Sequence, residues 1–458
     1  MRYNSPSTQL ALVGVTVFLI EGVRRLLYNY LMLWSPKNDN VGFNGYLPDG
    51  IVAVVSGFVC IFLVNLTGFR YIFVFFGLTN ILYACSTVVM FHSGWTAFQS
   101  AALIIGIVGN YANRVATLVI VLAYPSEKWK ARALAIFLLI EYLSNALGDI
   151  ITFHGFESST KTERYHVSIV YLAISCLGPF VALLVAPSHE VIRDNGVYIL
   201  SPETNLKTEF IETAKIFTSK KMLLMIPYMF SYPMLFGIAN MKLPDKLFIA
   251  MYDVGKIFVL FMGQLLDLPW SNRRTRGTLG LLILALFFFV SFGLTTSARY
   301  HHYDMTGLDV TWPDDKISNF MYEAVVKEQY KIVTVLLFFA GVASGFIELF
   351  GYWLMGTLTN DIKASARFVG AFHSFMALGG IIGFQTIKYH DSSYNPRVAP
   401  YYVAAGLTIL SFVLIFFVVR EIPDSNDWSL ERISHKEELV DLESSEAVAT
   451  ISDVKYSR

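Results

Sequence analysis

Long apolar runs alternate with short polar segments along most of the chain. A helix needs roughly 20 mostly apolar residues to cross a bilayer, and helix is the form that satisfies the backbone of such runs inside lipid. In the first half of the chain the predicted spans are 8–34, 45–66, 71–91, 97–123, 131–153 and 166–186. In the second half they are 222–241, 247–266, 277–297, 332–356, 368–387 and 400–419. The pattern therefore predicts an all-α integral membrane protein with twelve transmembrane helices.

Two polar segments divide the predicted spans into parts. Residues 187–221 separate the first six spans from the last six, and residues 420–458 are polar and acidic without a long apolar run. Acidic segments of low hydrophobicity cannot bury enough surface to fold alone. We expect two six-helix bundles, 1–186 and 222–419, joined by a cytosolic linker, 187–221, and followed by a disordered cytosolic tail, 420–458.

Composition agrees with a lipid environment and narrows the chemistry. Hydrophobic residues make up 55% of the chain, charged residues 15%, and the mean hydropathy is +0.52, which leaves too little polar surface for a soluble protein. The net charge of zero gives no argument for nucleic acid as a partner. Cys60, Cys85 and Cys176 lie inside apolar runs without the spacing of a metal or redox motif, so we interpret them as packing residues and expect no cofactor.

The longest predicted outward loop, 298–331, contains two histidines and an aspartate, His301, His302 and Asp304. Their spacing fits no metal-binding motif on a defined element. We therefore expect a solvated loop and no metal site.

Basic residues near the ends of the predicted spans indicate orientation. They cluster on one side of a twelve-span topology, at Lys128, Lys130, Arg132, Lys220, Lys221, Arg273, Arg274 and Arg276. Because basic loops stay on the cytosolic side, both termini should be cytosolic. The sequence does not distinguish the plasma membrane from an internal membrane. The glycosylation sequon at Asn65 would then face the cytosol and remain unmodified.

A short motif follows the second span of each half. In the second half, Gly263 and Asp267 precede a loop with Arg273 and Arg274, and this resembles the G-x-x-x-D and basic loop signature of the major facilitator superfamily. Glycine allows close helix approach, and a carboxylate at a helix end can form a gate contact that breaks when the halves rock. The alternative is that these are ordinary basic cytosolic loops.

The matching place in the first half keeps a glycine and an arginine but lacks the acid. Asn65 stands there, followed by Gly68 and Arg70. We therefore expect a weaker gate contact in the first half. Recurrence of the motif indicates an internal repeat of six-helix units.

Three further segments resemble the Unc-ninety-three-like family, in its fungal members. They are Tyr124-Pro125-Ser126-Glu127-Lys128-Trp129-Lys130, Val191-Ile192-Arg193-Asp194-Asn195-Gly196, and Tyr352-Trp353-Leu354-Met355-Gly356 with Asn360, Ala366, Arg367 and Gly370. The resemblance implies the major facilitator fold. It does not decide function, because the family includes regulators of channels and trafficking partners of receptors besides proteins regarded as transporters.

Ionisable residues inside the spans are the candidate site, because charge near the middle of a bilayer is costly and usually faces protein or water. In the resembled fold, spans one, four, seven and ten line a central cavity. The candidates for substrate binding or coupling are Glu21, Arg24, Arg25, Arg114, Glu141, Asn240 and Glu348. The alternative is purely structural pairing, of Glu21 with an arginine one turn later and of Arg114 with Glu141.

The function that these features predict is transmembrane transport of a small polar or anionic solute by alternating access. Arginines converging on a cavity would attract an anion, and Glu141 or Glu348 would carry a coupling proton. The alternative is a transport-inactive regulator or trafficking partner of another membrane protein. An enzyme is not expected, because we find no nucleophile elbow, phosphate loop or metal-ligand pair.

Overall fold

The computed structural model describes most of the helical part of the chain. It covers residues 3–34, 41–94, 96–126, 128–155, 161–192, 205–239, 246–269, 271–306, 319–359, 361–388 and 398–423. Met1–Ile422 form one compact unit, to which everything below refers. The predicted tail lies almost wholly outside the described residues.

The predicted spans of the first half correspond to helices. These are α1 (Pro6–Trp34), α2 (Val41–Thr67), α3 (Phe69–Ser93), α4 (Thr96–Ala123), α5 (Lys130–Gly155), α6 (Lys161–Ser175) and α7 (Leu177–Ala182). A 3₁₀ turn, η1 (Ser188–Glu190), and an amphipathic helix, α8 (Leu206–Phe217), lie within the predicted linker.

The second half follows the same pattern. Its helices are α9 (Lys220–Ala239), α10 (Lys246–Lys256), α11 (Val259–Leu266), α12 (Arg273–Thr306), α13 (Asn319–Leu358), α14 (Ile362–Lys388) and α15 (Val398–Arg420). Among the described residues, eight helices are long and apolar enough to cross a membrane by length and composition. The chain is thus an all-helical, multi-pass membrane protein.

Two predicted spans are each divided into a pair of helices. The sixth becomes α6 and α7, and the eighth becomes α10 and α11. Between α10 and α11 the backbone tightens into i to i+3 hydrogen bonds, with Ile257 N donating to Val254 O at 3.2 Å and Phe258 N to Gly255 O at 3.2 Å. Short 3₁₀ stretches inside a helix often mark a hinge.

The predicted bounds of the loop 298–331 are wrong at both ends. Helix α12 continues to Thr306 and α13 already begins at Asn319, so His301, His302 and Asp304 lie on a helix. Hydropathy identifies only the part of a helix that faces lipid, whereas polar residues can extend the same helix into water. Among the described residues there is no group of three His, Cys, Asp or Glu side chains able to hold a metal ion.

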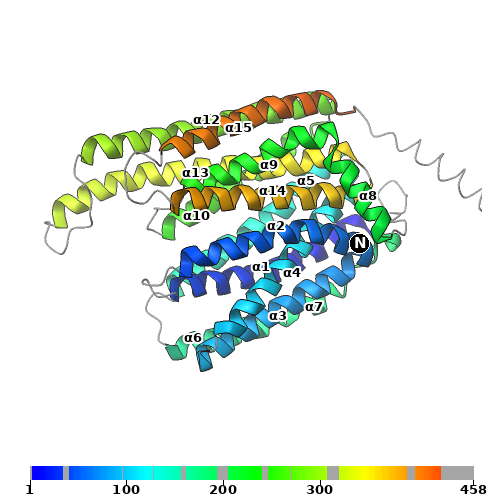
Figure 1. The fold of residues 1–458 in the computed structure, drawn as a ribbon, viewed down its shortest axis with the longest axis horizontal. Helices are drawn as coiled ribbons and strands as arrows, with labels where there is room; N and C mark the ends of the chain where they lie inside the picture. The colour runs from blue at the N-terminus through cyan, green and yellow to red at the C-terminus, as the bar shows by residue number, and fades with distance from the viewer. Residues whose placement is uncertain are drawn as a thin grey trace, which may run out of the picture. The chain divides into compact units, whose positions relative to one another are not determined.

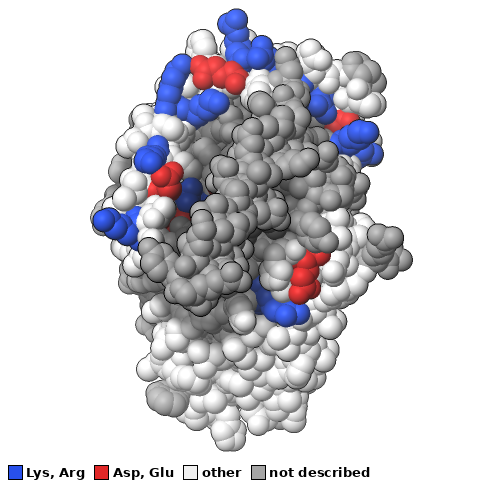
Figure 2. Space-filling model, turned by 90° about the vertical axis from the view of Figure 1, so that its right-hand side faces the viewer, with Lys and Arg blue, Asp and Glu red and all other residues white. Residues whose placement is uncertain are grey.

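Helices from the two halves of the chain pack along two seams (Figure 1). α2 lies against α14, and α5 lies against α10 and α11. The short helix α8 runs across one end of the other helices, and the N-terminus lies at that same end. We call this end of the unit the α8 end. Charged side chains gather around it, as Figure 2 shows from that side.

Large apolar side chains point outward along several helices. Leu282 and Leu286 on α12 are more than half exposed, as are Val403 and Val413 on α15. A soluble protein would rarely expose apolar stripes of this kind. Lipid is the solvent in which this surface is stable.

Glycines allow the closest helix contacts inside the second half. A Cβ atom built on Gly379 of α14 would lie 2.1 Å from the carbonyl oxygen of Phe230 in α9. Its neighbour Gly380 has open space around the same position. Only one of these adjacent glycines is therefore required by packing.

This contrast predicts different outcomes for two adjacent substitutions. Gly379→Ala forces a methyl group against backbone and should cost about 1–3 kcal/mol, lowering the melting temperature of the detergent-purified protein by several degrees. Gly380→Ala should melt at or slightly above the wild-type temperature, because alanine favours helix. Equal melting temperatures of the two variants would contradict the α9–α14 packing.

Candidate functional site

Three charged side chains from different helices meet near the centre of the unit. Arg114 of α4 lies with its Nη2 atom 2.7 Å from Glu141 Oε1 of α5 and 3.6 Å from Glu348 Oε2 of α13. One guanidinium therefore faces two carboxylates. α13 belongs to the second half of the chain, so the cluster joins both halves.

A second layer of polar side chains extends this cluster. The Tyr142 hydroxyl donates to Glu348 Oε2 at 2.9 Å. The Lys256 ammonium lies 4.8 Å from the centre of the Tyr142 ring, 4.5 Å from that of Tyr252, and 3.4 Å from Asp253 Oδ1. The pairing of Asp253 with Lys256 is the one that their i+3 spacing favours. Lys256 ends α10 at the 3₁₀ break, so the hinge and the central cluster are neighbours.

The cluster retains polar atoms that the protein does not satisfy. Glu141 Oε2 and Arg114 Nε are both buried without a hydrogen-bond partner among the described residues. The Arg114 side chain is nevertheless 29% accessible, whereas those of Glu141 and Glu348 are 7% and 11% accessible. Buried polar groups without partners are uncommon and often indicate a place for water, an ion or a ligand.

The other predicted central residues behave differently. Glu21 accepts a hydrogen bond of 2.9 Å from Nε of Arg24 on the same helix, α1, as the structural alternative proposed. Arg25 lies on α1 with its side chain outside the described residues, and Asn240 lies outside them altogether.

Asp267, a predicted gate residue, joins the halves at the α8 end. Asp267, at the end of α11, accepts hydrogen bonds from the backbone N–H groups of Ala131 at 3.1 Å and Arg132 at 2.8 Å. Its Oδ2 atom also lies 3.4 Å from Arg132 Nε. The acid therefore binds the first turn of α5, where the helix dipole and free N–H groups favour negative charge. Burial raises the pKa of the Asp267 carboxyl, and the hydrogen bonds from Arg132 and Ala131 offset part of that rise.

The loop arginines after Asp267 have other partners. Arg274 Nε donates to Ile422 O at 2.8 Å, tying α12 to the end of α15, and Arg273 is buried. Gly263 allows α11 to approach α5 closely, since a Cβ atom there would lie 2.4 Å from Ala135 Cβ. The partner of the Asp267 carboxylate is thus the opposite half of the chain rather than its own loop.

In the first half, Gly68 and Arg70 hold their own bundle together. Gly68 has φ of +84°, a conformation that glycine adopts without strain, and it joins α2 to α3. Arg70 donates to the carbonyl oxygens of Val185 and Leu183, both at 2.9 Å, just after α7.

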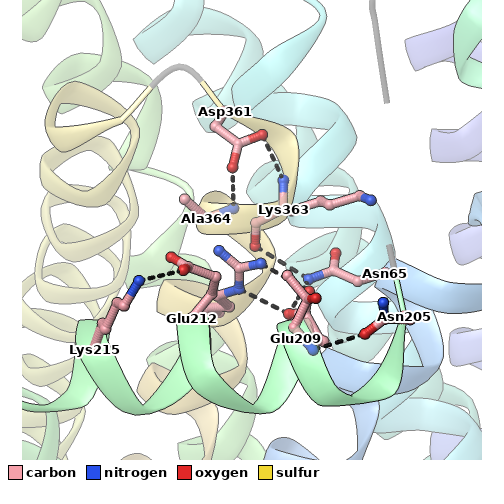
Figure 3. A network of polar contacts seen from close by, with 10 residues as sticks. Asn65, Asn205, Glu209, Glu212, Lys215, Asp361, Lys363 and Ala364 are labelled. Atoms are coloured by element: carbon pink, nitrogen blue, oxygen red, sulfur yellow. Dashed lines mark hydrogen bonds and ion pairs between the residues drawn. The ribbon is translucent and has the colours of Figure 1, made fainter. Parts of the chain in front are cut away.

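Asn65 belongs to a network that links three helices (Figure 3). Its Nδ2 atom donates to Glu209 Oε1 of α8 at 2.7 Å and to the Lys363 carbonyl of α14 at 3.3 Å. Glu209 also accepts two hydrogen bonds of 2.7 Å from Arg367 of α14, one on each carboxylate oxygen. Glu209 is fully buried. This forked pair is the strongest geometry for an arginine and a carboxylate.

The protonation state of Glu209 follows from these contacts. Burial alone would raise the pKa of its carboxyl, but hydrogen bonds from Arg367 and Asn65 outweigh burial and leave the pKa below its usual value. A lowered folded-state pKa means that the contact is complete above the ordinary value of about 4.3 and is lost as pH falls through the lowered pKa. The network is therefore intact at neutral pH.

Sequence reasoning missed Glu209 as a functional residue. It lies in a segment interpreted only as a polar linker, yet that segment carries a helix signal. Asn205 caps α8 by accepting a 2.8 Å hydrogen bond from Thr208 N. Glu209 and Thr213 are buried one turn apart, whereas Phe210 is exposed. An N-cap followed by an amphipathic pattern would have predicted the helix and its buried face.

The central cluster predicts a specific pattern of stability. Arg114→Ala leaves two carboxylates facing each other without a cation and should cost about 3–5 kcal/mol of unfolding free energy. Adding Glu141→Gln and Glu348→Gln to that variant removes the repulsion and should recover most of the loss. Thermal unfolding of the purified protein measures both, with Lys220→Ala, at an exposed pair, as the control that melts like wild type. A triple variant no more stable than Arg114→Ala would contradict the cluster.

Two curated fungal proteins resemble the chain along most of its length. No family model matches the chain. An UNC93-like protein of Schizosaccharomyces pombe is 23% identical over 416 residues, which cover 84% of this chain and 77% of that protein. Notoamide biosynthesis cluster protein O' of Aspergillus versicolor is 22% identical, with 95% of this chain and 96% of that protein covered.

Solved structures share the fold at low sequence identity. FucP, described as the E. coli fucose:proton symporter, was solved in an outward conformation and has a TM-score of 0.57 with 13% identity over 90% of this chain and 97% of FucP. The human organic anion transporter MFSD10 has a TM-score of 0.56 with 13% identity over 90% of this chain and 98% of its own. The chain therefore has the major facilitator fold, and its resemblance to the UNC93-like family, which its motifs indicated, is confirmed.

Proposed function

We propose that this chain is a transporter that carries a small polar or anionic solute across the membrane by alternating access. Twelve transmembrane helices in two six-helix bundles would rock about the seams of α2 with α14 and of α5 with α10 and α11. The α8 end would face the cytosol, as its basic residues favour, with both termini on that side. The proposal rests most directly on Arg114, an arginine between the halves that is partly accessible and has an unpaired Nε–H.

The unpaired atoms suggest what the solute offers. Arg114 Nε is a free donor that suits a carboxylate, phosphate or hydroxyl oxygen, while Glu141 Oε2 is a free acceptor that suits a donor. A polar or anionic solute would satisfy both atoms when it enters between the halves. The substrates for which the two structural neighbours are named, fucose and organic anions, belong to these classes.

The charge balance of the cluster supports proton coupling. Arg114 brings one positive charge, and Glu141 and Glu348 bring two negative charges when both are ionised. A proton on one carboxylate would neutralise the cluster, and movement of α13 against α4 and α5 would separate its members. Rocking would then bind and release a proton together with the solute.

A second candidate function is a transport-inactive regulator or trafficking partner of another membrane protein. Arg114 is already engaged by two carboxylates, which a purely structural cluster would also require. A relative that is named UNC93-like is compatible with this alternative. Nucleic acid is not a partner that any feature of the chain supports.

Uptake into proteoliposomes tests transport directly. Radiolabelled neutral sugars, monocarboxylates and dicarboxylates form the panel, and we expect saturable uptake of at least one class above empty liposomes. Arg114→Ala should lower that uptake at least roughly tenfold, because the solute loses its cationic partner. Lys220→Ala should transport like wild type. Absence of uptake for the whole panel would favour the regulator.

Proton coupling has its own test. An acidic exterior should stimulate uptake by the wild-type protein, because a proton then enters with the solute. Glu348→Gln cannot carry that proton and should lose the stimulation while keeping exchange of labelled for unlabelled solute. Stimulation that survives in both Glu348→Gln and Glu141→Gln would contradict coupling through this pair.

A further inference from the structure

The two gate positions of this fold are occupied unequally. Asp267 of α11 binds the first turn of α5 with a carboxylate, whereas the matching residue of α2, Asn65, presents a neutral amide to the first turn of α14. An amide cannot balance the guanidinium of Arg367, which lies in the next turn of α14. The residues of α2 therefore supply no negative charge to the first gate contact.

Helix α8 brings a carboxylate to this place. Glu209 binds Arg367 through both oxygens and accepts the Asn65 amide on the same oxygen as Arg367 Nε. The Arg367 side chain is 8% accessible and that of Glu209 is inaccessible, so the ion pair is shielded from water. Glu209 therefore supplies the carboxylate that lies between the Asn65 amide and the Arg367 guanidinium.

The position of α8 explains why a residue of the linker can supply this carboxylate. Asn205 fixes the first turn of the helix, and Glu209 lies within that turn, where negative charge is favoured. Lys363, at the start of α14, adds a second positive charge close to the carboxylate. The neighbouring acid Glu212 pairs with exposed Lys215 at 2.6 Å and acts on Arg367 only through its charge, without a hydrogen bond.

We propose that Glu209 is a positioning residue of the cytosolic gate, supplying from the linker the acid that Asn65 lacks. It holds α2, α8 and α14 together while the α8 end is closed, and it must release Arg367 before that end opens. The linker thus takes part in the gate instead of merely joining two bundles. This inference rests on the proposed alternation of the two halves.

The gate can be measured without a solute. In a background with the native cysteines Cys60, Cys85 and Cys176 replaced by serine, spin labels on Thr67→Cys and Thr275→Cys report the distance between the halves by double electron–electron resonance. Both sites are exposed at the α8 end, one on α2 and one on α12. The wild-type background should show mainly the short, closed distance.

Glu209→Gln should shift this distribution. We expect the longer-distance population to rise roughly tenfold, because the closed state loses its charged contact while the open state does not depend on it. Lys207→Gln, which removes an exposed charge from the same helix, is the control and should leave the distribution unchanged. An unchanged distribution in folded Glu209→Gln, judged by size-exclusion chromatography and melting temperature, would overturn the proposal.

A substitution at Asn65 separates this role from general packing. Asn65→Asp in the Glu209→Gln background returns a carboxylate to Arg367 and should restore the short distance. The same Asn65→Asp in the otherwise wild-type background places two carboxylates on one guanidinium and should increase the long distance. Asn65→Asp should thus change the long-distance population in opposite directions in the two backgrounds, because residue 65 and Glu209 serve the same Arg367. A change in the same direction in both backgrounds would overturn the proposal. If Glu209→Gln does not fold, Asn65→Asp in the wild-type background carries the test, and an unchanged distance distribution there would overturn the proposal.

The distance measurements and the uptake assays can succeed or fail independently of each other. If uptake is absent for every solute but the distances respond as described, the gate stands and the transport proposal fails. If uptake is present but Glu209→Gln and Asn65→Asp leave the distances unchanged, transport stands and the gate role of Glu209 fails.

Discussion

An arginine halfway along a membrane helix needs counter-charges, because an isolated cation among apolar helices costs several kcal/mol. Arg114 obtains them from Glu141 on α5 and Glu348 on α13. Since α13 lies in the second half of the chain, satisfying this cation draws the two halves together at the centre of the unit. The tyrosine and lysine side chains around the cluster are arranged by the same requirement.

A second constraint acts at the α8 end. Helix starts there present free N–H groups and arginines, and acids from elsewhere bind them. Asp267 reaches the start of α5 from α11, and Glu209 reaches Arg367 of α14 from α8. The two contacts cross between the halves or between a half and the linker. Together with the central cluster, these contacts connect the two halves of the chain at the α8 end and near the centre of the unit.

Hydropathy was sufficient to predict an all-helical membrane chain, because lipid demands long apolar runs and closed backbone hydrogen bonds. It could not predict the divided α10 and α11 or the extension of α12 to Thr306, since neither changes the apolar pattern of the span. The motif around Asp267 pointed to a gate, but its partner was not in the motif.

The sequence could not predict which charged side chains pair with one another. Glu21 and Arg24 are one turn apart, so their pairing follows from helix geometry alone. Arg114 pairs with Glu141, as the structural alternative proposed, and also lies near Glu348 of the other half. Glu209 and Arg367 are 158 residues apart, so only the packed structure brings them together.

Arg114 lies between the two halves of the chain, and alternating access requires that water reach it while the α8 end is closed. Asn110, one turn before Arg114 on α4, is partly exposed and can be replaced by cysteine in the cysteine-free background. Labelling with a membrane-impermeant thiol reagent, applied to either side of sealed vesicles, measures access directly. We expect modification from the side opposite the α8 end and protection from the α8 side. Protection from both sides, or modification from the α8 side alone, would contradict it.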